Sequence, residues 1–111
     1  MTTTANTYGS LTVLAVEPAL SGPETANFRR LATEHVARGG RWFVVDFVRA
    51  ASCDSRGLEE LLAFQEQIEA LGGAVRVAGL KGACSAIFGL TRFDKRFDVF
   101  GNLQEAVRSF D

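Results

Sequence analysis

The sequence predicts an α/β domain with a mixed, largely parallel sheet. Short runs of β-branched and aliphatic residues alternate with longer segments in which apolar residues recur every three or four positions. Such alternation is typical of parallel strands joined by crossover helices. The length of 111 residues suits one domain, and a composition of 47% hydrophobic and 23% charged residues is that of an ordinary globular protein.

The N-terminal third contains the beginning of the sheet and the first helix. Residues 1–10 are expected to be a flexible segment and the start of the first strand, with residues 8–10 as a turn or the end of a pairing strand. Residues 11–16 predict a strand that Pro18 ends or confines to a sheet edge. An amphipathic helix is expected to begin near Pro23 and to end at a glycine pair.

The rest of the chain continues the alternation of strands and helices. Residues 41–47 form a continuous apolar run, the pattern of a strand covered on both faces. Residues 58–71 predict a helix, because their apolar positions step by three and four along one face. The remaining predicted elements are a strand over 74–78, a helix over 83–90, a strand over 97–100 and a terminal helix over 103–110. This order gives about four helices.

The charge pattern and the N-terminus restrict the partners and the compartment. The formal net charge is −1, and basic residues are scattered among acidic ones, which argues against nucleic acid as a partner. The N-terminus lacks the charged and apolar regions of a signal peptide, and no apolar run approaches the ~18 residues that a membrane span needs. We therefore expect a cytoplasmic protein that does not insert into a membrane.

The sequence contains no pattern typical of a metal or cofactor site. Cys53 and Cys84 lie in unlike contexts, without a CxxC pair or a Cys/His cluster, and are expected to be reduced. A Walker-type phosphate loop is also absent from the sequence. We therefore predict neither a metal nor a cofactor.

The most informative stretch is Asp54-Ser55-Arg56-Gly57-Leu58, where an apolar strand-like run changes to a helix. By spacing alone its simplest interpretation is an N-cap, in which a side-chain oxygen accepts an early helix amide. The same geometry can accommodate a phosphate on Ser55, because the first helix amides lack intrahelical partners and the helix N-terminus is positive. Asp46, at the end of the preceding strand, is a helix-facing acid, a cap for the loop or a contributor to this site.

Catalytic interpretations of this stretch are weaker. A serine hydrolase needs a Gly-x-Ser-x-Gly elbow, but Cys53 stands at the position of the first glycine. The one imidazole, His35, lies on the apolar face of the first helix, where a core or border histidine is commoner than a catalytic base. A phosphatase built on Cys53 would need an arginine where Glu59 stands. No catalytic residue is predicted, and a hydrolase using Ser55 and His35 is the least favoured function.

Four segments taken together resemble the STAS domain family, the family of bacterial anti-sigma factor antagonists. They are Val44-Val45-Asp46-Phe47, Cys53-Asp54-Ser55-Arg56-Gly57-Leu58, Ala70-Leu71-Gly72-Gly73-Ala74-Val75-Arg76-Val77 and Phe93-Asp94-Lys95-Arg96-Phe97-Asp98-Val99-Phe100. The similarity extends from about residue 11 to residue 107. The resemblance implies a STAS domain over residues 11–110, a four- or five-stranded mixed sheet with helices mainly on one side, and no catalytic activity.

The resemblance also implies a mechanism. Ser55 matches the serine that a partner kinase, itself the anti-sigma factor, phosphorylates and that a PP2C-type phosphatase dephosphorylates. The unphosphorylated protein binds the kinase and releases the sigma factor, whereas the added charge breaks the complex. The implied contact residues are Asp54, Ser55, Arg56, Gly57, Leu58, Glu59 and Leu62, with Asp46 as possible support. We expect the protein to be a monomer.

Three features near this contact depart from the family pattern. Arg56 stands where the family commonly has a small residue, Glu59 stands where glycine is common, and residues 17–20 replace a Gly-x-Leu/Ile-Asp segment. Arg56 places a long cation beside the expected phosphate, where it could neutralise the switch or guide a particular kinase. The alternative function is a structural STAS subunit, an accessory of a lipid transporter or a stress-signalling scaffold, in which Ser55 is only a helix cap.

Overall fold

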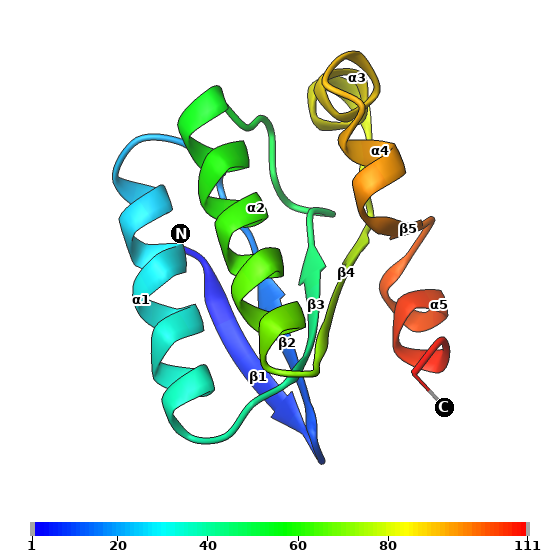
Figure 1. Cartoon of the computed structure of the whole chain (residues 1–111). Coiled ribbons are helices and arrows are strands. Elements are labelled where there is room, and N and C mark those ends of the chain that lie inside the picture. The colour runs from blue at the N-terminus through cyan, green and yellow to red at the C-terminus, as the bar shows by residue number, and fades with distance from the viewer. Residues whose placement is uncertain (1, 111) are drawn as a thin grey trace.

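A five-stranded sheet with the order β1-β2-β3-β4-β5 forms the centre of the computed structural model, which describes residues 2–110 (Figure 1). β1 pairs antiparallel with β2, and every later neighbour along the sheet is parallel. The strands are β1 (Thr4–Tyr8), β2 (Leu11–Ala15), β3 (Trp42–Asp46), β4 (Ala74–Ala78) and β5 (Asp98–Phe100). The expected mixed sheet is therefore confirmed, with one antiparallel strand at its edge.

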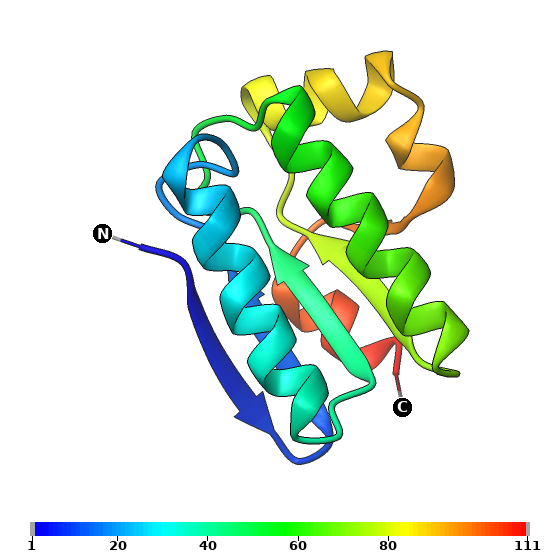
Figure 2. The same ribbon diagram turned by 60° about the vertical axis from the view of Figure 1, so that its left-hand side comes forward.

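Within residues 2–110, five helices cover the sheet unequally. They are α1 (Pro23–Ala37), α2 (Ser55–Ala70), α3 (Gly82–Leu90), α4 (Phe93–Arg96) and α5 (Leu103–Arg108). α1 and α2 lie side by side on one face, whereas α5 lies on the other (Figure 2). Side chains of α3 and α4 extend the core that α1 and α2 form with the sheet. Helices thus pack mainly on one side, as expected.

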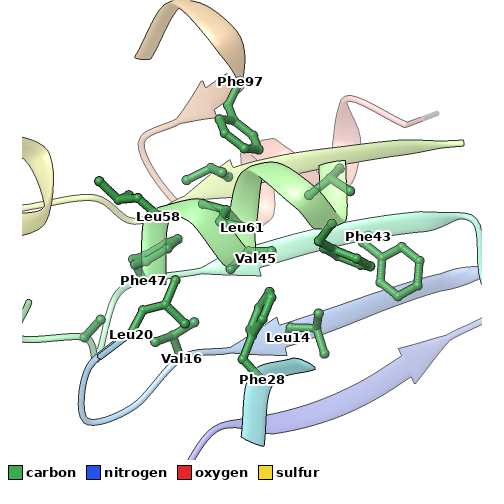
Figure 3. Close-up of a cluster of buried hydrophobic side chains, with 14 of the residues drawn as sticks. Leu14, Val16, Leu20, Phe28, Phe43, Val45, Phe47, Leu58, Leu61 and Phe97 are labelled. Atoms are coloured by element: carbon green, nitrogen blue, oxygen red, sulfur yellow. The ribbon is translucent and has the colours of Figure 1, made fainter. Parts of the chain in front are cut away.

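Aromatic side chains connect the two large helices to the sheet (Figure 3). Phe64 of α2 makes edge-to-face contacts with Phe43 of β3 and Phe28 of α1, at ring-centroid distances of 4.9 and 5.8 Å. Such pairs add to the stabilisation from apolar burial and restrict the relative orientation of the packed elements. A smaller core on the opposite face joins Val44 of β3 to Ala106 of α5.

Residues 2–10 are more ordered than the sequence suggests. Residues 4–8 form β1, where we expect a flexible segment and only the start of a strand. The backbone amide of Thr3 donates to Glu24 Oε1 at 3.1 Å, and this bond is the main reason that the pKa of Glu24 is lowered. The N-terminal strand is therefore attached to the start of α1. Met1 lies outside the described residues.

The largest differences from the predicted helices are at α2 and α4, and α5 also ends at Arg108 rather than at residue 110. α2 begins at Ser55, before the expected start at Leu58, because Asp54 provides a cap that the apolar spacing does not reveal. α4, from Phe93 to Arg96, was not expected, since a single helical turn is too short to show a periodic pattern. These differences are local and leave the order of the strands unchanged.

Candidate functional site

Ser55 lies at the end of the sheet where the parallel strands have their C-termini. It is the first residue of α2, and its side chain is exposed. The preceding residue, Asp54, is the N-cap, and its Oδ1 accepts a hydrogen bond from the backbone amide of Gly57 at 2.8 Å. Because Asp54 caps the helix, the Ser55 hydroxyl is not needed for capping, and it has no hydrogen-bond partner within residues 2–110.

The β2–α1 loop holds the segment before Ser55 through backbone hydrogen bonds. Leu20 and Cys53 form an isolated parallel bridge. The amide of Leu20 donates to the Ser52 carbonyl at 3.0 Å, and the amide of Asp54 donates to the Leu20 carbonyl at 3.2 Å. The β2–α1 loop and the segment before Ser55 therefore form one surface. This surface includes residues 17–20.

Two of the expected contact residues, Gly57 and Leu58, are buried beneath this surface. A Cβ atom on Gly57 would lie 2.0 Å from the carbonyl oxygen of Leu20. A residue larger than glycine would therefore force the β2–α1 loop away from α2. The side chain of Leu58 is only 3% exposed and belongs to the core. Both residues position the start of α2, and neither presents a side chain to a partner. The exposed members of the expected set are Asp54, Ser55, Arg56 and Glu59, with Leu62 half-buried.

Arg56 is the one basic residue of that exposed set. It makes no ion pair within the described part of the chain, whereas Asp54 and Glu59 are acidic neighbours. The positive end of α2 adds to the potential that Arg56 creates around the Ser55 hydroxyl. A phosphate there would add about −1.5 to −2 charges next to Arg56.

Asp46 caps its own loop rather than contacting Ser55. Its side chain is 6% exposed, and Oδ1 accepts a hydrogen bond from the Val48 amide at 3.1 Å. A Cβ atom on Gly79 would lie 2.8 Å from the same oxygen, so the carboxylate is packed beneath the loop after β4. Burial raises the pKa of Asp46, although the Val48 hydrogen bond and the charge of Arg49 oppose this effect.

We expect Asp46→Asn to be more stable than the wild type at neutral pH. A raised folded-state pKa means that the folded protein binds the proton more tightly, so the wild type loses stability as pH rises from about 3.9 through the folded-state value. Asparagine retains an oxygen for the Val48 amide. Urea denaturation at about pH 3 and about pH 7 tests this. If Asp46→Asn and the wild type differ in unfolding free energy by the same amount at both pH values, this prediction is wrong.

The two cysteines lie close together behind the Ser55 loop. The Cys84 thiol contacts the Ala50 carbonyl at 3.8 Å, and Cys53 is half-buried beside it. Burial raises the pKa of Cys53 to about 12, with a further contribution from Cys84. Because the thiolate is the reactive form of cysteine, Cys53 is a weak nucleophile, and its packing against the core is its observed role. Both are free thiols, as expected.

Ser55 and His35 do not form a catalytic pair. α1 and α2 both begin at the end of the sheet where the parallel strands have their C-termini. His35 is in the last turn of α1, at the opposite end of that helix. At 1.5 Å per residue, His35 lies about 18 Å along the helix axis from the first residue of α1. Within residues 2–110 no group of three or more His, Cys, Asp or Glu side chains is placed to hold a metal ion.

Sequence analysis did not identify the exposed apolar surface of α3. Cys84 of this helix lies next to the Ser55 loop, and Leu90 at its end is 83% exposed. The available signal was the absence of charged residues between Lys81 and Arg92, which leaves the helix without a polar face. α3 therefore borders the candidate site with uncharged surface.

The family model described as "Mlab, STAS domain" matches residues 4–105. The chain belongs to the STAS domain family. The comparison of this STAS domain with curated proteins finds no match. No helix within residues 2–110 has the length and apolar character needed to cross a membrane.

Solved structures of antagonists share the fold of this STAS domain. A putative anti-sigma factor antagonist from Thermotoga maritima has a TM-score of 0.89 at 15% identity, covering 96% of this chain and 92% of the other. An anti-sigma factor antagonist from Mycobacterium paratuberculosis has a TM-score of 0.88 at 21% identity, covering 97% and 92%. The phosphorylated Bacillus cell fate determinant SpoIIAA has a TM-score of 0.78 at 14% identity, covering 98% and 99%.

Proposed function

We propose that this STAS domain is a phosphorylation-controlled binding module in a partner-switching pathway. Its partner is a serine kinase that also acts as an anti-sigma factor, and a PP2C-type phosphatase reverses the modification of Ser55. The supporting observation is that the Ser55 hydroxyl is exposed and free at the first position of α2, since Asp54 provides the cap. The residues offered to the partner are Ser55, Arg56 and Glu59.

A phosphate on Ser55 would act mainly through charge. The loop is held by the Leu20 hydrogen bonds and by Gly57, so the modification changes an already ordered surface. The first amides of α2 tolerate a phosphate, so phosphorylation need not unfold the domain. A partner packed over Ser55 would have to desolvate the phosphate next to Asp54, which disfavours the complex.

Phosphopeptide mapping tests the modification itself. The protein is isolated from its native cells, grown with and without stress, beside a Ser55→Ala variant. We expect a phosphate on Ser55 whose occupancy changes with the growth condition and which is missing from the variant. A constantly unmodified Ser55 would contradict the proposal and favour the structural-subunit alternative.

A further inference from the structure

A polar cavity lies at the opposite end of the sheet from Ser55. It has a volume of about 310 Å³. Its lining comes from the turn between β1 and β2, the adjoining strands and the C-terminal end of α1. The turn and this end of α1 are at the bottom of Figures 1 and 2. The polar residues that line it are Thr7, Ser10, Thr12, His35, Arg38 and Arg41.

The lining of this cavity is cationic. Arg38 and Arg41 contribute the positive charge, and none of the residues that line it is acidic. Arg41 Nη1 donates to the carbonyl oxygens of Val36 at 3.3 Å and Gly40 at 2.7 Å, which fixes its guanidinium against the end of α1. Arg38 makes no ion pair within residues 2–110. The positive charge of the cavity is therefore not neutralised by its own walls.

Some of the carbonyl groups at the negative end of α1 are hydrogen-bonded within the protein. Free carbonyl groups at a helix C-terminus repel anions. Here the Gly39 amide donates to the Val36 carbonyl at 2.9 Å, and the Gly40 amide donates to the His35 carbonyl at 2.9 Å. Together with the bonds from Arg41, these satisfy the carbonyl oxygens of His35 and Val36 in the last turn of α1.

Several hydrogen-bond donors around the cavity remain available. His35 Nδ1 lies 3.0 Å from the Leu31 carbonyl and donates to it, so this donor is already used. The Thr12 side chain is almost completely enclosed, at 2% exposure. The hydroxyls of Thr7, Ser10 and Thr12 have no hydrogen-bond partner in the described part of the chain.

We propose that this cavity binds a small oxyanion, namely a phosphate group. Arginine guanidinium groups and hydroxyls are donors with which proteins recognise phosphate, and charge-assisted bonds to it are strong. The volume is at the lower end of ligand pockets, which suits phosphate or a small phosphate ester. This site is distinct from Ser55, and its occupation requires neither the partner kinase nor modification of the protein.

Amide NMR of the whole chain tests this assignment with two probes, inorganic phosphate and glycerol 3-phosphate. Sodium chloride at matched ionic strength provides the baseline. We expect saturable shifts at the amides of Thr7, Thr12 and Gly40 with either probe, and stronger binding of one probe identifies free phosphate or an ester as the preferred form. Arg38→Gln should weaken binding about tenfold, because it removes a charge-assisted contact from an exposed helix end.

Two further variants make the result specific. Thr12→Val retains the β-branched shape and should weaken binding severalfold through loss of one hydroxyl. Lys95→Gln removes an equal charge from α4, outside the cavity, and should leave binding unchanged. The proposal is overturned by an absence of saturable shifts, by shifts confined to Ser55 and Gly57, or by equal weakening in Arg38→Gln and Lys95→Gln. Ser55→Ala should bind phosphate normally, whatever the outcome for partner switching.

Discussion

Gly57→Ala is expected to lower the free energy of unfolding by about 3 kcal/mol. Alanine normally stabilises a helix relative to glycine by about 0.5–1 kcal/mol, so the expected sign is opposite to helix propensity. The reason is steric, since the new Cβ would lie 2.0 Å from the Leu20 carbonyl oxygen. Urea denaturation followed by circular dichroism measures the change.

Gly89→Ala is the matched control for this effect. Gly89 lies within α3, and a Cβ atom there would meet no atom within 4 Å. The control should be neutral or stabilising by up to about 1 kcal/mol. If Gly57→Ala is as stable as Gly89→Ala, the close contact between the β2–α1 loop and α2 is not a determinant of stability.

The second large effect is expected at Ser55 and depends on the proposed function. Ser55→Asp should weaken the complex with the kinase that phosphorylates Ser55 about 100-fold, which corresponds to about 2.7 kcal/mol. The carboxylate must be desolvated at the contact beside Asp54, and an unpaired buried charge at an interface costs about 2–5 kcal/mol. Calorimetric titration with the purified kinase, sought among the products of neighbouring genes, gives the affinity.

Two variants separate this effect from a general loss of binding. Ser55→Ala retains the small neutral surface and should bind as the wild type does. Gln104→Glu adds the same charge on α5, on the opposite face of the sheet, and should also bind normally. Wild-type affinity of Ser55→Asp would exclude charge as the switch and favour a structural STAS subunit.

Local sequence patterns predicted most of the helices and strands. β4 has the bounds that the apolar run over 74–78 indicates, because a glycine pair precedes it and Gly79 follows it. The start of α2 was placed too late, since periodic apolar residues begin only at Leu58 while the cap is Asp54. Helix ends depend on a few hydrogen bonds, which hydrophobic spacing does not encode.

The geometry of the candidate site depends on long-range contacts that a local sequence pattern does not contain. The bridge between Leu20 and Cys53 joins two loops that α1 and β3 separate in the chain. The burial of Leu58 likewise depends on a core formed by distant strands and helices. The resemblance to the STAS family implied that Leu58 and Ser55 belong to one contact, whereas packing directs one side chain inward and leaves the other exposed.

The sequence by itself determined the α/β class, the alternation of strands and helices, and the presence of a serine where a helix begins. These follow from backbone propensity and apolar periodicity, which act over a few residues. Only the tertiary structure decided that Ser55 is free of the capping role, that Gly57 is enclosed by Leu20, and that His35 lies at the other end of α1. Those outcomes depend on how parallel strands align their ends and bring distant loops into contact, which is a property of the packed sheet.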